Sequence, residues 1–465
     1  MEVIVSNKIV VKNPTSELLN YCRGLRIPNP EFHKKERMGL WLGNTPRDIV
    51  LYEKMGDSVV LPFGCLNYVW RKYQDTSHFK RDISPLRLVD YQSNIKLYPY
   101  QEKAVNEAIC KKNGIIVMPC GAGKTQTGLE LINRIGGRTL WLTHTQDLLT
   151  QSMNRAKSVF GLDRSQYGTI TGGKVNIGSA ITFATVQTMC KIDLTDYKYA
   201  FDVVIVDECH KAIGSPTKCM QFYKVLSNLA CRYKYGLTAT PKRADGLEQT
   251  MFALLGNTIA EVDREAVADT TCPIKVQVVK TNYIPDEDIV LAGDGTLNYS
   301  KLVDDLVHNE NRFDFILQTI KSLPKKQPLF VLANRVEYLE RLCDAYNNSN
   351  VGIGVCLSGM GTSKSAKEQR KQTLTALNNG NIDCVFATYQ LAKEGLDVPN
   401  LRYVIFATPE KDETTVIQSV GRVGRKADGK EYGTVIDFED NFGMYHGWQR
   451  KRLGFYKRIK AEIIL

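Results

Sequence analysis

The sequence predicts an α/β protein with two parallel-sheet domains in tandem and a smaller α+β domain before them. From Ile95 onward, short β-rich runs alternate with helical stretches, which is typical of a parallel sheet covered by helices on both faces. The alternation occurs twice, with a junction between Glu261 and Pro273. A length of 465 residues suits three domains of about 150 residues each. We therefore expect domains over residues 1–94, 95–265 and 266–465.

The N-terminal segment has its own pattern of elements. Met1–Lys12 is strand-like, and Thr15 or Ser16 can cap a short helix that Gly24 ends. Apolar runs on both sides of Met55-Gly56-Asp57 predict a hairpin, and residues 65–73 predict a helix. Residues 1–96 contain 15 Lys and Arg against 10 Asp and Glu, a net charge of +5. This basic segment is predicted to be a separate small domain.

The two α/β series follow in order. The predicted strands are Ile115–Met118, Thr139–Thr143, Ile181–Thr185, Val203–Val206 and Tyr235–Thr238, then Leu329–Ala333, Gly354–Leu357, Cys384–Thr388, Tyr403–Ala407 and Thr434–Phe438. Residues 281–300 are acidic and contain glycine, so they are expected to form a long loop. The basic stretch Gln449–Leu465 is expected to be a helix throughout.

A phosphate-binding loop follows the first of these strands. Pro119-Cys120-Gly121-Ala122-Gly123-Lys124-Thr125 lies between a buried strand and a helix. Glycines turn backbone N–H groups toward phosphate oxygens, and the helix N-terminus adds a favourable dipole. Lys124 can reach the β- and γ-phosphates, and Thr125 can bind Mg²⁺. The general pattern has glycine where Met118 stands. The loop predicts ATP as cofactor, with Mg²⁺.

An acidic pair follows the strand Val203–Val206. The carboxyl ends of parallel strands are where open α/β sheets bind ligands. There Asp207 can hold the Mg²⁺ that Thr125 also contacts, and Glu208 can orient and deprotonate the attacking water. An Asp-Glu pair by itself is more often a solvated loop. Its position 83 residues after Lys124 favours the catalytic interpretation.

Charge and cysteine content indicate which kind of partner and which cellular compartment to expect. The net charge of +11 favours a polyanionic partner. The 12 cysteines include no Cys-x-x-Cys pair, which argues against a zinc site or disulfide framework and suits a reducing compartment such as the cytoplasm. No apolar run approaches the ~18 residues that a bilayer span needs. The first residues do not resemble a secretory signal.

The ordered motifs resemble those of superfamily 2 helicases over about Ile95 to Asp440. Beyond the phosphate loop and Asp207-Glu208-Cys209-His210, the matching segments are Tyr98-Pro99-Tyr100-Gln101, Leu237-Thr238-Ala239-Thr240-Pro241, Ala387-Thr388, Glu394-Gly395-Leu396-Asp397-Val398-Pro399, and Gln418 to Arg425. The resemblance implies two RecA-like domains. It also implies that Tyr100 and Gln101 bind the adenine and that Gly395 and Asp397 contact the nucleotide. His210, Thr238 and Thr240 would couple the ATP site to the nucleic-acid strand along which the motor moves, here called the track.

The resemblance further assigns catalytic residues to the second series and a nucleic-acid-binding surface to both series. Gln418, Arg422 and Arg425 are catalytic, and the two arginines, three apart, are expected to share one helix face and act as arginine fingers. The residues expected to grip nucleic acid are Gly172, Gly173, Thr185, Gln187, Asn334 and Thr388. Backbone and hydroxyl contacts suit a motor because they ignore base identity. The simpler interpretation of Gly172-Gly173 is a plain turn.

Within the superfamily, the Asp-Glu-Cys-His form is most similar to phage UvsW-type and XPB-like DNA helicases. That resemblance implies an ATP-dependent helicase or translocase that remodels branched DNA by fork regression or Holliday junction branch migration, in replication, recombination or repair. Two alternatives stay open: an RNA helicase, and a nucleic-acid-dependent ATPase switch such as a transcript-release factor. The expected partner is therefore forked or branched DNA, with RNA as the alternative. The same resemblance implies that the basic residues 1–94 form an accessory domain that binds DNA.

Overall fold

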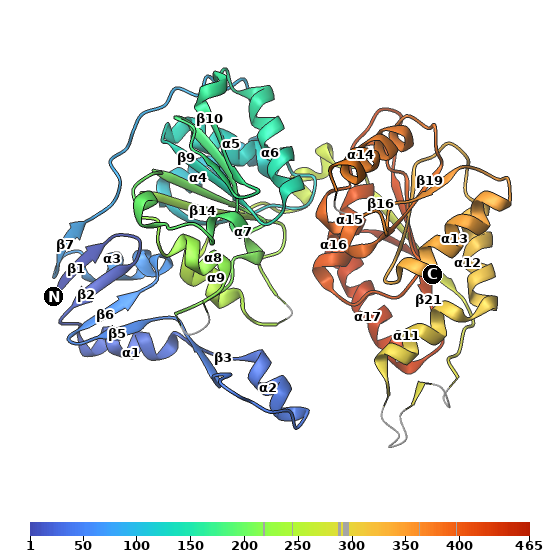
Figure 1. Cartoon of the computed structure of the whole chain (residues 1–465), viewed down its shortest axis with the longest axis horizontal. Coiled ribbons are helices and arrows are strands. Elements are labelled where there is room, and N and C mark those ends of the chain that lie inside the picture. Colours follow the sequence, from blue (N-terminus) through green and yellow to red (C-terminus); the bar gives the residue numbers. More distant parts are fainter. Residues whose placement is uncertain (217–218, 244, 287–289, 292–296, 362, 397) are drawn as a thin grey trace. The chain divides into compact units, whose positions relative to one another are not determined.

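A computed structural model describes residues 1–216, 219–243, 245–286, 290–291, 297–361, 363–396 and 398–465 (Figure 1). The chain divides into two compact units. The first unit consists of Met1–Pro119 with Gly123–Asp263, and the second of Arg264–Leu465 with Cys120–Ala122. Each unit contains one large parallel sheet, so the predicted α/β class with two tandem domains is confirmed. No described helix has both the length and the apolar character needed to cross a membrane.

The first unit begins with a small α+β part. Its five-stranded sheet has the order β5-β6-β2-β1-β7. The elements are β1 (Glu2–Val5), β2 (Ile9–Lys12), β5 (Glu53–Met55), β6 (Ser58–Leu61) and β7 (His78–Arg81), with helices α1 (Ser16–Gly24) and α3 (Leu66–Tyr73). Thr15 caps α1 by accepting a hydrogen bond from the N–H of Leu18 at 3.2 Å. The predicted hairpin is confirmed, because Met55 pairs with Ser58 across Gly56-Asp57.

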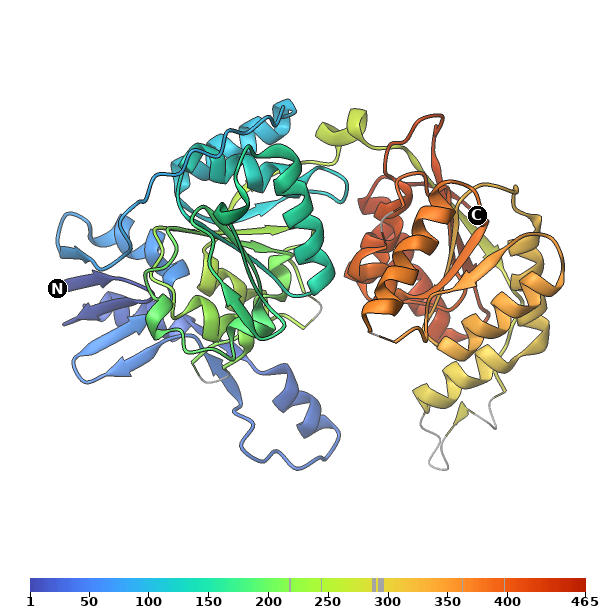
Figure 2. The ribbon, with the colours of Figure 1, turned by 45° about the horizontal axis from the view of Figure 1, so that its top comes forward.

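An arm leaves this small sheet (Figures 1 and 2). Strands β3 (Arg26–Pro28) and β4 (Asp48–Val50) form an antiparallel ribbon, and α2 (Pro30–Arg37) lies between them in the chain. No residue of α2 is buried. At the base of the arm, Ile49 and Leu51 pack against Leu247 and Ala253 of the α/β part. The arm is therefore anchored to the rest of the unit at one end only.

The main sheet of the first unit has the order β11-β10-β12-β9-β13-β14-β8-β15, and only β11 is antiparallel to its neighbour. Strands β9, β12 and β13 are buried along their whole length, as expected for strands covered on both faces. The strands are β8 (Asn113–Val117), β9 (Thr139–Thr143), β10 (Tyr167–Thr171), β11 (Lys174–Asn176), β12 (Ile181–Thr185), β13 (Val203–Asp207), β14 (Tyr233–Thr238) and β15 (Thr258–Glu261). The helices are α4 (Pro99–Lys111), α5 (Lys124–Ile135), α6 (Gln146–Val159), α7 (Val186–Met189), α8 (Gln221–Leu226) and α9 (Glu248–Leu255).

The sheet of the second unit is parallel throughout, with the order β18-β19-β17-β20-β21-β16-β22. Its strands are β16 (Ile274–Lys280), β17 (Leu329–Ala333), β18 (Gly354–Cys356), β19 (Cys384–Thr388), β20 (Tyr403–Phe406), β21 (Gly433–Glu439) and β22 (Glu462–Ile464). Its helices are α11 (Tyr299–His308), α12 (Glu310–Ser322), α13 (Val336–Asn348), α14 (Lys364–Asn378), α15 (Tyr389–Gly395), α16 (Glu413–Val423) and α17 (Gly443–Arg458).

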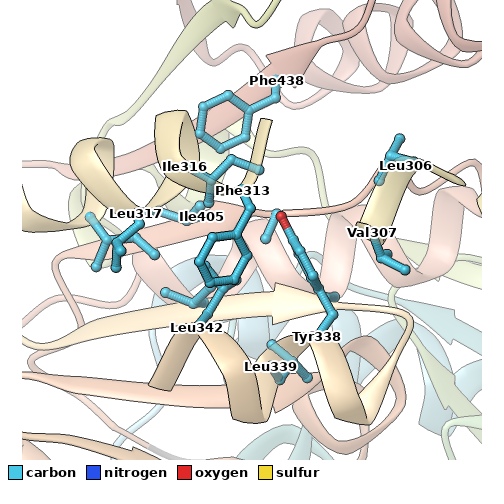
Figure 3. Close-up of a cluster of buried hydrophobic side chains, with 14 of the residues drawn as sticks. Leu306, Val307, Phe313, Ile316, Leu317, Tyr338, Leu339, Leu342, Ile405 and Phe438 are labelled. Atoms are coloured by element: carbon cyan, nitrogen blue, oxygen red, sulfur yellow. The ribbon is translucent and has the colours of Figure 1, made fainter. Parts of the chain in front are cut away.

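One face of this second sheet is covered by α12 and α13. Figure 3 shows Phe313 of α12 beside Tyr338 and Leu342 of α13, in a cluster that includes Ile405 of β20 and Phe438 of β21. The rings of Phe313 and Tyr338 meet edge to face at 5.9 Å between centroids. A second apolar cluster, with Val404 and Val420, lies apart from the first, so two apolar cores stabilise the one sheet.

Two expectations about the second series need correction or limitation. The C-terminal helix ends at Arg458, and residues 462–464 form β22 beside β16, so the prediction of a helix to Leu465 is wrong. Lys460 adopts a left-handed φ of 53°, which ends the helical path, and the β-branched Ile463 and Ile464 follow. Within the predicted loop 281–300, residues 287–289 and 292–296 lie outside the described residues, and α11 begins at Tyr299.

Candidate active site

The phosphate loop joins β8 to α5 at the carboxyl edge of the first sheet. Gly121 and Gly123 both adopt left-handed φ angles, of 83° and 78°, which glycine reaches without steric cost. A Cβ atom on Gly123 would also lie 2.4 Å from the Gln101 Nε2 atom. Lys124 and Thr125 are then the first two residues of α5. The loop therefore presents backbone N–H groups and a helix N-terminus, as an anionic phosphate requires.

The predicted adenine-binding residues lie at the start of α4, next to this loop. Gln101 is buried, and its Oε1 accepts a hydrogen bond from the backbone N–H of Tyr98 at 2.9 Å. The rings of Tyr98 and Tyr100 stack at 5.6 Å between centroids. The side chain of Gln101 thus fixes the start of α4 and packs against Gly123, which brings the two predicted nucleotide-binding segments together.

The acidic pair Asp207-Glu208 lies at the end of β13. In the sheet, β14 lies between β13 and β8. Asp207 accepts hydrogen bonds from the Glu208 N–H at 3.0 Å and the Ser152 hydroxyl at 3.4 Å. Burial and the adjacent Glu208 carboxylate raise the pKa of Asp207. Burial also acts to raise the pKa of Glu208, but the Lys124 ammonium and His210 lower it overall. The two buried carboxylates outweigh the single Lys124 ammonium, so the site favours a bound cation.

The predicted coupling residues form a chain of polar contacts that begins at Glu208. His210 Nδ1 lies 3.3 Å from Glu208 Oε2 and 3.1 Å from the Thr238 hydroxyl. The Thr238 hydroxyl in turn accepts a hydrogen bond from the Thr240 N–H at 3.1 Å. Glu208 itself has a left-handed φ of 49°, an unusual conformation for this residue type that concentrates at functional sites. The end of β13 is therefore connected to the segment after β14.

Two residues of this network were not expected from the sequence. Arg243 donates to the carbonyl of His210 and forms an ion pair with Asp245 at 2.6 Å. Its position just after Thr240-Pro241-Lys242 is the signal that could have identified it. Ser152 of α6 donates to Asp207 from 55 residues earlier in the chain, and nothing local in the sequence marks it.

The predicted nucleic-acid contacts of the first unit follow the ends of β10 and β12. Gly172 and Gly173 form the two-residue turn between β10 and β11, with φ angles of 58° and 77°. The Thr185 hydroxyl is hydrogen-bonded to Thr188 at 3.0 Å, and Gln187 Nε2 donates to the His144 carbonyl at 2.7 Å. The geometry of the turn by itself accounts for the two glycines.

The predicted contacts of the second unit lie at the carboxyl edge of its sheet. The Asn334 N–H, after β17, donates to the Thr408 hydroxyl at 3.0 Å. The Thr388 N–H, at the end of β19, donates to Ser358 Oγ at 2.7 Å, and Thr388 caps α15. Thr408 and Ser358 were not expected from the sequence. Because Asn334 and Thr388 end neighbouring strands, the structure brings them to one edge.

The catalytic side chains expected in the second unit lie in and after α16. Gln418 and Arg422 are on this helix, and Arg422 donates to the Leu396 carbonyl. Arg425 is not on the helix, which ends at Val423, so the prediction that Arg422 and Arg425 share a helix face is wrong. Gly424 ends the helix, and Arg425 instead pairs with Thr271. Gly395 is the last residue of α15, and Asp397 lies outside the described residues.

Comparison with known proteins agrees with this arrangement. Residues 94–243 match the family "Type III restriction enzyme, res subunit", and residues 311–427 match the helicase conserved C-terminal domain. The chain is 23% identical to the ATP-dependent DNA helicase uvsW of Enterobacteria phage T4, over 89% of this chain and 84% of that protein. It is 26% identical to the DNA 3'-5' translocase XPB2 of Sulfurisphaera tokodaii, over 75% of this chain and 82% of that protein.

An RNA-related protein and a solved structure are also similar. The chain is 27% identical to the "Putative ATP-dependent RNA helicase L396" of Acanthamoeba polyphaga mimivirus, over 82% of this chain and 70% of that protein. The structure of S. cerevisiae Dbp5 bound to RNA and ADP BeF3 has a TM-score of 0.56 at 15% identity, and the match covers 79% of this chain and 90% of that one. This last likeness shows the fold.

The fold and the site thus define an ATP-hydrolysing helicase, built from two RecA-like domains and an N-terminal accessory domain. The chain belongs to helicase superfamily 2 and is similar to its UvsW-type and XPB-like members. It binds nucleic acid and hydrolyses ATP, as the resemblance of its motifs implied.

Proposed function

We propose that the protein is an ATP-dependent DNA helicase or translocase that remodels branched DNA. The observation that carries this proposal is the extent of the similarity to a DNA helicase. The match to the phage uvsW helicase covers 89% of this chain, about 414 of 465 residues, whereas residues 95–465 number only 371. The similarity therefore extends into the accessory part, which both helicase family models leave out.

ATP and Mg²⁺ fit the residues at the phosphate loop. Backbone N–H groups of Cys120 to Thr125 and the Lys124 ammonium would hold the phosphates, and Thr125 and Asp207 would hold Mg²⁺. Bound Mg²⁺ would supply the charge neutralisation that phosphoryl transfer requires. Glu208 would accept the proton of the attacking water, with His210 fixing its carboxylate. Arg422 and Arg425 would stabilise the negative charge that develops on the γ-phosphate.

The arm of the N-terminal part supports a nucleic-acid-binding role for residues 1–94. Lys34, Lys35 and Arg37 lie in the last turn of α2. Just beyond it, the Trp41 side chain is 88% exposed, and its ring contacts the backbone at Gly43, where a Cβ atom would lie 2.8 Å away. Cations and an exposed aromatic ring on the same arm suit phosphates and an unstacked base. The arm therefore supports the binding of a fork or junction.

Steady-state ATP hydrolysis with different nucleic acids tests the proposal. The rate is measured with Mg²⁺ alone, then with single-stranded DNA, duplex DNA, a four-way DNA junction, and RNA of matched length. We expect the junction to give the strongest stimulation, and the Lys124→Ala variant is the background control. Equal stimulation by all DNA forms would contradict a role on branched DNA.

An RNA helicase is the second candidate, because the similar mimivirus protein carries that name and its match covers 82% of this chain. Stronger stimulation by RNA than by any DNA form would favour it over the branched-DNA motor. Stimulation without strand separation would favour an ATPase switch, which the same substrates can reveal in an unwinding assay.

A further inference from the structure

A basic cavity of about 190 Å³ lies within the first unit, between the small N-terminal sheet and the amino-terminal ends of β8 and β14. Its lining includes residues from four separate places in the chain: Trp70 in α3, Arg81 in β7, the consecutive Lys111, Lys112 and Asn113 between α4 and β8, and Arg232 just before β14. The cavity is therefore formed only when the accessory part packs against the motor domain.

The charge of the cavity is entirely positive. Four of its lining residues are Lys or Arg, and none is Asp or Glu. Within the described part of the chain, none of these four cations forms an ion pair with a carboxylate. Such a surface favours an anion, because cations gathered without counter-charges attract phosphate groups.

Two of the residues that line the cavity each carry a buried donor without an acceptor. Asn113 is 2% exposed, and its Nδ2 atom has no hydrogen-bond partner among the described residues. The Nε atom of Arg232 is likewise buried without a partner there. Burying a donor without an acceptor is unfavourable, and both groups are N–H donors. An acceptor-rich ligand such as phosphate is the kind of partner that both donors lack.

An aromatic surface lies beside these donors. The Trp70 side chain is 39% exposed, and the Arg81 guanidinium lies 5.6 Å from the centre of its ring. Indole and guanidinium planes are the groups on which nucleic-acid bases stack. The cavity thus has one element that suits a phosphate and one that suits a base.

The cavity is at the opposite end of the strands from the ATP site. Asn113 begins β8, and the phosphate loop begins at Pro119, beyond the other end of that strand. At ~3.3 Å per residue a separation of about six residues spans about 20 Å, so a ligand here leaves the phosphate loop free. The track residues after β10 and β12 also lie at that far edge.

We propose that this cavity binds one nucleotide unit, with its phosphate on Asn113, Lys112 and Arg232 and its base against Trp70. The source of that unit is a nucleic-acid strand or a free nucleotide, which the experiment below separates. Only the strand source rests on the proposed function. A strand held here would connect the accessory part to the motor through its own backbone.

Binding by the full-length protein tests the proposal. The protein is first saturated with a non-hydrolysable ATP analogue, and the affinity for a labelled 20-nucleotide oligo-dT and for dTMP is then measured. The test variant is Lys112→Asn with Arg232→Gln. Asparagine tolerates the left-handed φ of 64° at position 112. The matched control is Lys103→Asn, an exposed lysine on the same helix, outside the cavity lining.

Removing two phosphate-binding cations should make the slope of log K against log salt for oligo-dT shallower by about 1.4, since each single-strand phosphate contact contributes about 0.7. The control should change that slope by about 0.7 at most. If the double variant binds oligo-dT more weakly and dTMP as before, the cavity holds a strand. If it binds dTMP more weakly as well, the cavity holds a free nucleotide. Unchanged binding of both ligands overturns the proposal.

Trp70 provides a second readout that does not depend on the stability of the double variant. Oligo-dT or dTMP should quench the tryptophan fluorescence of the unaltered protein, and Trp70→Phe should remove that component. Persistence of the full quench in Trp70→Phe would also overturn the site. ATP hydrolysis without nucleic acid should be the same in all variants. Cavity binding that persists when no DNA form stimulates hydrolysis would show that the proposed function, not this site, has failed.

Discussion

Two strands with similar sequences, one in each unit, end in acidic residues whose charged partners differ. Strand β13 ends at Asp207, which Glu208 follows, and β21 contains Asp437, with Asp440 just beyond its end. In the first unit the carboxylates lie near Lys124 and His210. In the second unit each carboxylate is held by a buried arginine, with Asp437 bound to Arg452 at 2.8 Å and Asp440 to Arg312 at 2.7 Å.

The difference shows that the partner, rather than the strand, decides what a buried carboxylate does. Arg312 reaches Asp440 from 128 residues earlier in the chain and also donates to the Ala407 carbonyl at 2.9 Å. A bidentate guanidinium uses the lone pairs that a metal ion would need. Among the described residues, Asp207 accepts hydrogen bonds only from one hydroxyl and one N–H, so its charge is available to a cation.

The largest effect should come from Glu208→Gln, which keeps the shape of the side chain but removes the proton acceptor. ATP turnover should fall by about 10²–10⁴-fold, the usual contribution of a general base. ATP binding should persist, because Lys124 and the loop are unchanged. Single-turnover hydrolysis measures the first quantity, and binding of a fluorescent ATP analogue measures the second. A variant that hydrolyses ATP at the normal rate would remove Glu208 from the site.

In the second unit, removing the partner of a buried carboxylate should lower the free energy of unfolding instead of ATP turnover. Arg312→Met leaves Asp440 buried without its partner, which typically costs about 3–5 kcal/mol. Urea unfolding measures this cost, and Arg312→Met with Asp440→Leu should recover most of it, since an apolar pair of similar volume is often neutral. If the single variant unfolded at the same urea concentration as the unaltered protein, the two acidic strand ends would not differ as we describe.

Lys234 extends the comparison, because it is a buried cation of the first unit with no carboxylate partner among the described residues. Its ammonium donates to the Leu226 carbonyl at 2.9 Å and lies 4.3 Å from the centre of the Phe63 ring. Burial lowers the pKa of Lys234 to about 8. Lys234→Met should therefore stabilise the protein at neutral pH, by about 3 kcal/mol at 1.36 kcal/mol per pKa unit.

The pH dependence of that stabilisation follows from the direction of the shift. Below pH 8 the lysine is charged in both states, and the folded state bears the full cost of burying the charge. Between pH 8 and about 10.4 the unfolded chain keeps the proton that the folded chain has lost, so the unaltered protein gains stability as pH rises. The advantage of Lys234→Met should shrink across this window in urea unfolding. A constant advantage would mean that Lys234 keeps its proton in the folded protein across this window and that burial does not lower its pKa.

The sequence predicted the parts of the fold that depend on local patterns. Strands β9, β12, β17 and β19 have the predicted bounds, because each is an apolar run between polar residues. Strand β11 was not predicted, since Lys174–Asn176 is short and exposed along its length. Its only signal was the glycine pair before it.

The site divides in the same way. The residues of the phosphate loop and the acidic pair stand next to strands, so their places at the sheet edge could be predicted from the chain. Ser152 could not be, because its role depends on α6 packing beside β13. Arg425 was misplaced because a helix-period argument carried the helix beyond Val423, whereas Gly424 ends it.

The smallest effect concerns Gly172, where a turn and a nucleic-acid contact make different predictions. Gly172→Asn and Gly172→Asp have nearly the same shape, and a Cβ atom there would meet nothing within 4 Å. Both variants should lose about 1 kcal/mol or less, because Asn and Asp tolerate the left-handed φ of 58° better than other residues do. If Gly172 serves only the turn, both variants should bind DNA alike. If the Gly172 N–H faces a phosphate, the negative charge of Asp should weaken DNA binding by an additional ~0.2–1 kcal/mol, which is up to about fivefold in Kd. Fluorescence anisotropy at low salt measures the ratio of the two Kd values. Equal values would mean that Gly172 forms only the turn between β10 and β11 and does not contact nucleic acid.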